Sequence, residues 1–493
     1  MRCLRIHGAS WDSVFLTVGK LLTMLFSIIS AKMMSEGLSL SEYGTYSQAN
    51  MISSVGTSLI LLGLGDALLY YFSGKQKEID NQQRNRIVNT VFFLELLIGL
   101  VLAVLLLLGQ ELLVDYFENP AVRSLLPIVA FLPMLSNLIY FYQVLYVGAG
   151  KAKMMSVYSV IMILIRIVSI YFAVYVLENL LLIFIVLILQ DIVQIFLYNH
   201  TLTNSGIKIN PFKISTAHIG RIFAYGLPMG IYAVTSSLNR EIGKIVVDRL
   251  AGAEELAIYT NCSKMLPVDI LVSSFALVLV PHIIRHVTEK NRERSLALFS
   301  NYLKVGYYSV WILGAMLLIT PQTVISFLYD DKYLPGTMIF VLYVFDSMLR
   351  FASMHQVLVA SNKTKLLMLY SAGSLILNLV LSVLLYHLLG LMGPAIASLL
   401  SAFAYTWLVL RKSMKLMDAK FTDMFDLKEI SWLLLSIGIL WAVCSFLYER
   451  LVSSGVHMYI AMIASMALFG CSALAIHFKK IAKILKEINT FRI

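Results

Sequence analysis

The sequence predicts an all-α polytopic membrane protein with fourteen transmembrane helices, and two observations lead to this class. Hydrophobic residues make up 59% of the 493 residues, charged residues only 14%, and the mean hydropathy is +0.81. A soluble protein of this size could not bury so many apolar side chains. Apolar runs of about twenty residues, the length that crosses a bilayer as a helix, also follow one another from Val14 to Phe478.

The apolar runs define the expected helices in chain order. The predicted spans are residues 14–34, 43–73, 87–108, 124–149, 154–177, 180–202, 219–250, 255–285, 298–320, 337–361, 364–388, 394–416, 430–449 and 457–478. Several are longer than twenty residues, so we expect them to tilt or to protrude from the bilayer.

Lys and Arg residues are concentrated on one side of these spans. An even number of spans places both termini on the same side, and 27 of the 39 basic residues fall there, against five on the other side. Because basic residues accumulate in cytoplasmic loops, both termini are predicted to be cytoplasmic. The net charge of +11 then reflects topology and contact with anionic membrane lipids, and not binding of nucleic acid.

The C-terminal segment KKIAKILKEINTFRI is basic and amphipathic. It places Ile481, Ile484, Leu485 and Ile488 on one helical face with lysines around them, which favours a helix lying on the inner leaflet. The four cysteines are far apart and show no metal-ligand or CxxC spacing, so we expect no metal site and no cofactor.

A series of residues recurs in order at an offset of 213 positions. The matched pairs are Glu42 and Glu255, Tyr46 and Tyr259, Gln143 and Gln356, Val144 and Val357, and Leu145 and Leu358. Such a series predicts that helices 1 to 6 are repeated as helices 7 to 12. Since six is even, the repeat is parallel, with two six-helix bundles around a cleft. The expected domains are a lobe at 1–204, a lobe at 205–416, and residues 417–493 with two extra helices and the basic cytoplasmic tail.

The predicted helix over residues 219–250 carries charge in its second half. Arg240, Lys244 and Asp248 recur every four residues and therefore form one stripe. A Lys or Arg at the bilayer centre costs about 2.5–3.5 kcal/mol even on the mildest insertion scale, which predicts that the stripe lines a water-filled cavity. For Lys244, snorkelling to the interface is the alternative. The corresponding positions of the first helix are uncharged, so the repeat itself does not require the stripe.

Other charged residues lie within predicted spans. Arg166 is deep in its helix, which favours a role in a cavity or in a buried pair. Asp346 and Arg350 are four residues apart and are expected to pair within their helix. Asp191, near two glutamines, is expected to make an interhelical polar contact.

Several segments together resemble a known family. They are YGLPMGIY, LNREIGKIVVDRLAGAEELAIYTNCSKMLPVDI, SLSEYGTYSQAN, LYDDKYLPG and LILNLVLSVLLYHLLGLMGPAIAS. The chain is similar in these segments, over most of its length, to Wzx-type oligosaccharide flippases of the multidrug/oligosaccharidyl-lipid/polysaccharide exporter superfamily. Relatives often carry an acidic residue just before the lysine of helix 7, where this chain has Gly243, so the resemblance does not imply a salt bridge at Lys244.

The resemblance implies a carrier that flips undecaprenyl-pyrophosphate-linked oligosaccharide repeat units across the bacterial cytoplasmic membrane by alternating access, for O-antigen or capsule biosynthesis. Its helices 1, 2, 7 and 8 border a central cavity, which here implies the residues Lys20, Asp66, Arg240, Lys244, Asp248, Lys264 and Asp269. The basic members, with Arg166, are the candidates for binding substrate, because a diphosphate needs Arg forks or Lys point charges. The acidic members are candidates for ion coupling or charge balance. Expected partners are membrane lipids, a polysaccharide polymerase, a chain-length regulator, and H⁺ or Na⁺.

Two other functions compete with flipping as readings of the sequence. A cation-coupled drug or small-molecule antiporter of the same superfamily would favour an acidic chamber, whereas the implied cavity group has four basic and three acidic residues. A membrane-bound polymerase, ligase or glycosyltransferase would usually show a large outer loop or a DxD-like motif. The longest outer breaks, residues 109–123 and 321–336, are short, and no His or carboxylate cluster forms an acid/base set, so we expect no catalytic residues and no enzyme activity.

Overall fold

In the computed structural model, the described part of the chain is helical and contains no strand. The structure describes residues 6–61, 64, 65, 68, 81–149, 151–204, 207–211, 213, 214, 216–264, 283, 286, 287, 289, 291–352, 354–361 and 363–490.

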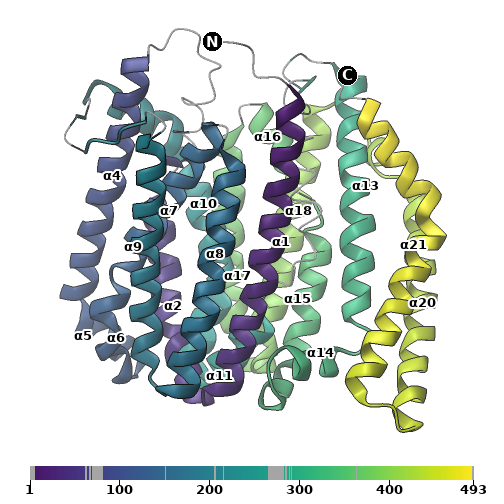
Figure 1. Ribbon diagram of the computed structural model, residues 1–493. Helices are drawn as coiled ribbons and strands as arrows, with labels where there is room; N and C mark the ends of the chain where they lie inside the picture. The colour runs from purple at the N-terminus through teal and green to yellow at the C-terminus, as the bar shows by residue number, and fades with distance from the viewer. Residues whose placement is uncertain are drawn as a thin grey trace. The chain divides into compact units, whose positions relative to one another are not determined.

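The chain forms two compact units, Met1–Ala257 and Ile258–Ile493 (Figure 1). The helices of the first unit are α1 (Ile6–Gly37), α2 (Leu40–Leu61), α4 (Asn81–Leu108), α5 (Gln110–Phe117), α6 (Ala121–Val129), α7 (Leu132–Gly148), α8 (Ala152–Tyr171), the π-helical turn η1 (Phe172–Val176), α9 (Leu180–Asn204) and α10 (Thr216–Ala251). The helix α11 (Ala253–Cys262) crosses the boundary between the units.

The second unit continues to the C-terminal end. Its elements are α13 (Arg292–Leu317), α14 (Pro321–Leu328), the 3-10 helix η3 (Asp331–Gly336), α15 (Thr337–Leu349), α16 (Gln356–Ala360), α17 (Thr364–Leu389), α18 (Met392–Leu416), α19 (Phe421–Met424), α20 (Leu427–Ser453) and α21 (Met458–Thr490). The compact units place α10 with the helices before it, whereas the repeat places it at the start of a second lobe. The lobes 1–204 and 205–416 and the C-terminal part 417–493 therefore stay a prediction.

Eight helices of the described residues are long and apolar enough to cross a membrane, or nine if α13 and α14, which meet at 85°, form one broken span. The eight coincide with the predicted spans that begin at residues 87, 124, 154, 180, 364, 394, 430 and 457. In addition, α10 is one continuous helix of 36 residues over the predicted span 219–250. The all-helical membrane class is confirmed, and the count of fourteen stays a prediction.

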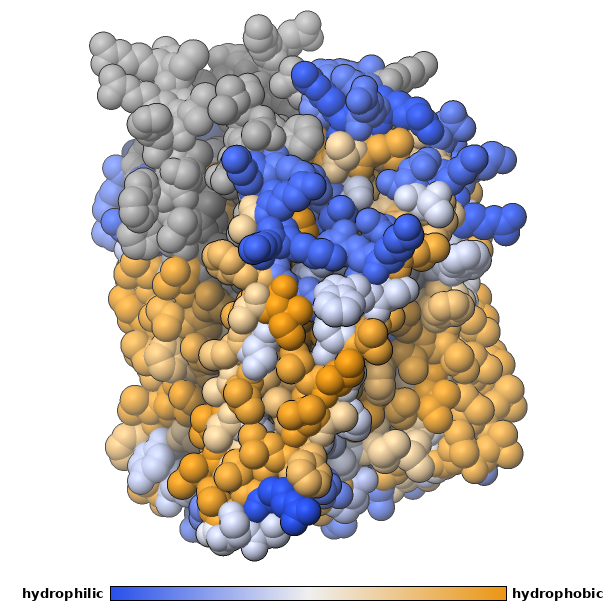
Figure 2. All heavy atoms as spheres, turned by 90° about the vertical axis from the view of Figure 1, so that its right-hand side faces the viewer, coloured by the Kyte–Doolittle hydropathy of each residue, from blue (hydrophilic) through white to orange (hydrophobic). Residues whose placement is uncertain are grey.

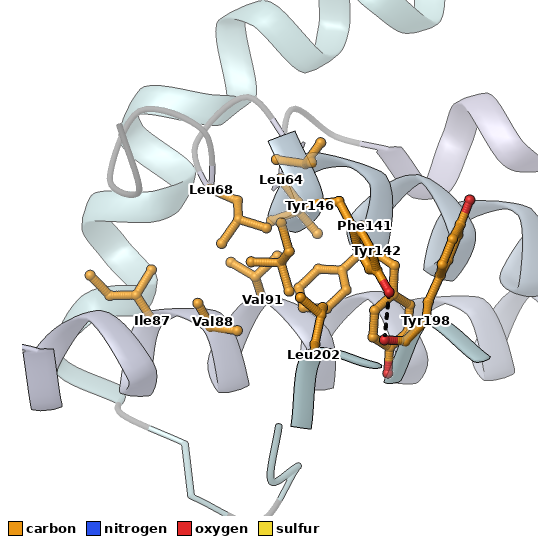
Figure 3. Close-up of a cluster of buried hydrophobic side chains, with 12 residues drawn as sticks. Leu64, Leu68, Ile87, Val88, Val91, Phe141, Tyr142, Tyr146, Tyr198 and Leu202 are labelled. Carbon is orange, nitrogen blue, oxygen red and sulfur yellow. Dashed lines mark hydrogen bonds between the residues drawn. The ribbon is translucent and has the colours of Figure 1, made fainter. Parts of the chain in front are cut away.

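The first unit is built around aromatic side chains of α7 (Figure 3). Phe141, Tyr142 and Tyr146 are buried against apolar residues of α4 and against Tyr198 of α9. The Tyr146 hydroxyl donates a hydrogen bond of 3.2 Å to the Tyr198 carbonyl, so its polar end is satisfied inside the cluster (Figure 3). This core fixes α4, α7 and α9 to one another.

The predicted span 337–361 is wrong as one helix, because α15 ends at Leu349 and α16 begins only at Gln356. The backbone at the break lies against Gly306 of α13, where an added Cβ would be 2.4 Å from the Phe351 carbonyl oxygen. Side chains also supply donors to carbonyls around the break: Trp311 Nε1 donates to the Met348 carbonyl at 2.9 Å. Irregular backbone is tolerated at membrane depth where protein groups satisfy it, as they do here.

The segment after residue 478 is not a separate helix, because α21 runs without interruption from Met458 to Thr490. Its amphipathic pattern is nevertheless real: Ile484 is only 6% exposed, whereas the Lys483 side chain is 78% exposed. Figure 2 shows hydrophilic side chains gathered at one end of the face formed by α20 and α21, above a broad apolar surface. The basic segment thus extends the last span, with its apolar face turned to the protein.

One local feature agrees with an internal repeat. Lys151 precedes α8, and its backbone N–H donates to the Tyr146 carbonyl at 2.8 Å. Lys363 precedes α17, and its N–H donates to the Leu358 carbonyl, also at 2.8 Å. The same turn therefore follows the two Gln-Val-Leu segments, one in each unit, and the repeat as a whole stays a prediction.

Candidate functional site

The second half of α10 packs along α2 through a row of polar contacts. Ser58 Oγ donates to Ser237 Oγ at 2.6 Å, and Ser54 Oγ donates to Glu241 Oε1 at 3.1 Å. The residue numbers fall along α2 as they rise along α10, so the two helices are antiparallel. Small hydroxyl side chains of α2 thereby let the backbones approach and also bond the polar face of α10.

The row ends at Asp248, which is 4% exposed. Gln48 Nε2 donates to Asp248 Oδ1 at 2.7 Å, and Asn119 Nδ2 donates to Gln48 Oε1 at 2.7 Å. The other carboxylate oxygen, Asp248 Oδ2, makes no hydrogen bond to the described residues. Asp248 is therefore anchored to α2 through one oxygen and retains a second oxygen able to accept a further bond.

Lys244 and Glu241 form an ion pair within α10, with 2.9 Å between Lys244 Nζ and Glu241 Oε2. Both side chains are mostly buried, at 21% and 11% exposure. The acidic partner thus stands three residues before the lysine, and Gly243 does not prevent a salt bridge. Arg240, one turn earlier, is exposed. On this helix Glu241 and Asp248 therefore bond α2, while Arg240 of the predicted stripe is exposed.

A cavity of about 420 Å³ lies at the end of α10 in the first unit. Asp248, Asn119 and Tyr116 line it, together with Arg249 and Glu118, whose side chains form an ion pair. Asp248 is the buried carboxylate that reaches this cavity.

Two glycines permit the close packing next to this cavity. Gly252 adopts a φ of +91° between α10 and α11, a conformation that other residues rarely adopt. A Cβ at Gly44 of α2 would lie 2.1 Å from the Ala253 carbonyl oxygen, so only glycine fits there. The start of α2 is thus fixed against the turn that follows α10.

Arg166 of α8 binds two residues of the neighbouring helix α9. Its Nε donates to Gln190 Oε1 of α9 at 3.1 Å, and its Nη2 lies 3.8 Å from Asp191 Oδ1. These contacts confirm the expected interhelical polar contact of Asp191 and identify the partners of Arg166. In the part of the chain that the structure describes, no ion pair joins Arg166 to α10.

Lys264 belongs to the second unit. Its Nζ donates to Asn261 Oδ1 at 2.8 Å and lies 5.6 Å from the centre of the Tyr329 ring. A cation over an aromatic face is stabilised by the ring electrons. The expected pair of Asp346 and Arg350 is confirmed in the same unit, with 2.9 Å between Asp346 Oδ2 and Arg350 Nε.

Three predicted site residues cannot be placed. Asp66 and Asp269 lie outside the described residues. Lys20 lies on α1, and its side chain is also outside them. Among the residues that the structure does describe, no group of three or more His, Cys, Asp or Glu side chains could hold a metal ion.

Sequence reasoning missed the partners of the charged stripe. Glu241 could have been found, because a carboxylate three residues before a lysine is a common helical pair. The partners on α2, Gln48, Ser54 and Ser58, could be recognised only as polar residues in an apolar span. Their pairing with α10 required knowledge of which helices are neighbours.

Residues 37–338 match the profile of a family described as "Polysaccharide biosynthesis protein". The match covers α2, α10 and all the described helices between them. No curated protein sequence matches the chain.

Similar solved structures are membrane transporters. An inward-facing multidrug resistance MATE transporter of the MOP superfamily is 13% identical, with a TM-score of 0.68. The matched region is 80% of this chain and 94% of the transporter chain. The lipid II flippase MurJ, in an inward closed conformation, is 14% identical, with a TM-score of 0.67. The matched region is 95% of this chain and 100% of the MurJ chain. A MOP superfamily transporter from Pyrococcus furiosus is 13% identical, with a TM-score of 0.63. The matched region is 82% of this chain and 94% of that transporter chain. At these identities the likeness shows a shared fold.

Proposed function

Because the chain belongs to the family of polysaccharide biosynthesis proteins, we propose that it flips lipid-linked oligosaccharides across the bacterial cytoplasmic membrane. Family and fold agree with the resemblance to Wzx-type flippases that the sequence predicts. The proposed substrate is an undecaprenyl-pyrophosphate-linked repeat unit for O-antigen or capsule. The proposed mechanism is alternating access by two six-helix lobes, 1–204 and 205–416, with both termini in the cytoplasm.

The observation that carries the proposal is the division of charge on α10. Its carboxylates at Glu241 and Asp248 are bonded to α2, while Arg240 is exposed and Lys244 is one turn away. A diphosphate carries concentrated negative charge and is bound by Arg and Lys through charge-assisted hydrogen bonds. The helix therefore carries an exposed cation, Arg240, suited to an anionic head group, while Glu241 is engaged by Ser54 and Lys244 and Asp248 by Gln48.

The remaining predicted residues complete the proposal. Lys20, Lys264 and Arg166 would supply further positive charge to the diphosphate or to acidic sugars. Asp248, whose Oδ2 is buried without a hydrogen bond to the described residues beside the cavity at the end of α10, would bind H⁺ or Na⁺ and couple its movement to transport. Asp66 and Asp269 would serve the same charge balance. A polymerase and a chain-length regulator would use the flipped product.

The test is complementation of a bacterial strain whose own oligosaccharide flippase has been deleted. We expect the full chain to restore surface polysaccharide and to remove the accumulated lipid-linked units from the inner leaflet. Arg240→Ala with Lys244→Ala should abolish export when export is compared per amount of protein in the membrane. A matched control is Lys479→Ala with Lys486→Ala, two exposed lysines of α21, which should export normally.

The same strains distinguish the antiporter alternative. A drug antiporter would raise resistance to cationic compounds and leave polysaccharide export unrestored. Normal export by the Arg240 and Lys244 double variant would instead show that flipping does not depend on this part of α10.

A further inference from the structure

An apolar groove of about 360 Å³ lies between α13 and α21 in the second unit. Its walls include Val305, Ile312, Met316, Leu474, Ile481 and Ile484. The two hydroxyl groups of its lining are already engaged: Ser309 Oγ donates to the Val305 carbonyl at 2.6 Å, and Tyr308 Oη donates to Glu429 Oε1 at 2.8 Å. The groove therefore offers a hydrocarbon surface, which suits an alkyl chain.

The length of the groove matches one leaflet of a bilayer. Val305 and Met316 line it on α13, and the helix rises about 17 Å between them at 1.5 Å per residue. The hydrocarbon core of a bilayer is about 30 Å thick, so one leaflet is about 15 Å. An acyl chain of a membrane phospholipid would fill such a groove, whereas a long polyprenyl chain would extend far beyond it.

A second, polar pocket of about 320 Å³ adjoins one end of the groove. Ile484 lines both. In sequence, Lys304 of the pocket directly precedes Val305 of the groove, and Lys480 directly precedes Ile481. The two cavities thus form one amphiphilic site, apolar along the helices and charged at its mouth.

The acidic residues at this mouth already have partners. Glu429 accepts the Tyr308 hydroxyl and lies 3.4 Å from Lys304 Nζ. Asp426 caps α20 by accepting backbone N–H groups of residues 428 and 429 at 3.0 and 3.1 Å. The third carboxylate, Glu487, lies 3.8 Å from Lys483 Nζ. Each carboxylate of the pocket thus has a partner inside the protein, and its four lysines outnumber its three carboxylates.

Two lysines at the mouth of the pocket have no carboxylate partner among the described residues. Lys428 and Lys480 line the pocket, are exposed, and make no ion pair with the residues that the structure describes. Figure 2 shows the hydrophilic cluster of this end directly above apolar side chains. This end carries the basic residues of the side that the sequence predicts to be cytoplasmic, where anionic lipids attract basic residues.

We propose that the groove and the pocket together bind one anionic phospholipid of the membrane. One of its two acyl chains lies between α13 and α21, and its phosphate group contacts Lys428 and Lys480. Bound there, the lipid ties the last helix to α13 at a place where the protein alone leaves space. This site is independent of the charged residues of α10 and of the transported substrate.

The test is native mass spectrometry of the purified full chain, titrated with phosphatidylglycerol or with zwitterionic phosphatidylcholine of the same acyl chains. We expect one phosphatidylglycerol molecule to bind at least tenfold more tightly than phosphatidylcholine. Each lysine near a lipid surface contributes about 1 kcal/mol, or about fivefold in affinity, so Lys428→Gln with Lys480→Gln should bring the two lipids close to equal affinity. Lys479→Gln with Lys486→Gln changes the same charge on α21 outside the pocket and should preserve the preference.

A second pair of variants tests the groove. A Cβ at Gly470 would be 3.8 Å from Met316 Sδ, an ordinary contact, so Gly470→Ala should bind lipid normally. Gly470→Leu extends into the groove and should weaken binding of both lipids at least tenfold, with an unchanged elution profile on gel filtration. Three results would overturn the proposal. They are equal affinity of the wild type for the two lipids, loss of the preference for phosphatidylglycerol in the Lys479 and Lys486 control as well, and undiminished lipid binding by Gly470→Leu.

Discussion

Gln48 Nε2 donates a hydrogen bond of 2.7 Å to Asp248 Oδ1, from α2 to α10. The amide is itself oriented, because Gln48 Oε1 accepts from Asn119 Nδ2. An amide whose oxygen is already bonded presents its NH₂ group in one direction. The carboxylate of Asp248 is thus held by a positioned donor, which makes this contact a structural support of the proposed site.

Replacing the donor should destabilise the protein. Gln48→Leu removes the bond while Asp248 stays buried, and hydrogen bonds to charged groups contribute about 1.5–3 kcal/mol. We expect a lower midpoint of thermal unfolding in detergent, measured by tryptophan fluorescence. Gln48→Leu with Asp248→Leu should recover most of the loss, because no buried carboxylate is left. Gln322→Leu, at an exposed glutamine of α14, is the control, and equal melting of Gln48→Leu and this control would contradict the prediction.

The ion pair of Glu241 and Lys244 allows stability and transport to be separated. Lys244→Met leaves Glu241 mostly buried with the Ser54 hydroxyl as a donor, and should cost about 1–3 kcal/mol of stability. Glu241→Gln with Lys244→Met removes both charges and should restore the unfolding midpoint. We expect export of surface polysaccharide to stay defective in both variants, because the substrate loses a cation. Normal export by the stable double variant would mean that Lys244 only neutralises Glu241.

Arg166 should depend on the shape of its guanidinium group. It reaches Gln190 through Nε and Asp191 through Nη2, which the single ammonium group of a lysine cannot imitate. Arg166→Lys should therefore lower stability by about 1 kcal/mol, measured by thermal unfolding. Arg166→Met with Asp191→Leu replaces the pair by apolar side chains and should regain stability. Export by this double variant at the wild-type level would remove Arg166 from the candidates for binding substrate.

The helical spans could be predicted because they follow from local composition. Twenty apolar residues in a row specify a membrane helix whatever its neighbours are, and α4, α17 and α20 lie where hydropathy places them. Pairs within one helix could be predicted for the same reason, since Asp346 and Arg350 need only helical spacing.

Features that depend on helix neighbours could not be predicted in the same way. The partner of Arg166 is on α9, and the partner of Asp248 is 200 residues away on α2. The break after α15 has no proline or glycine at residues 350–355 to announce it. At the break, the absence of a side chain at Gly306, on a different helix, makes room for the carbonyl of Phe351.

This close approach gives the last prediction, in which two glycines of the second unit are compared. Gly306→Ala places a methyl group 2.4 Å from the Phe351 carbonyl oxygen, which is backbone and cannot rotate away. Gly373→Ala, within α17, meets nothing within 4 Å and should gain up to about 1 kcal/mol from the better helix propensity of alanine. We expect Gly306→Ala to lower the midpoint of thermal unfolding and Gly373→Ala to hold or raise it. The opposite order would show that the break after α15 does not depend on the close approach at Gly306, and an equal change in both would point to helix propensity as the common cause.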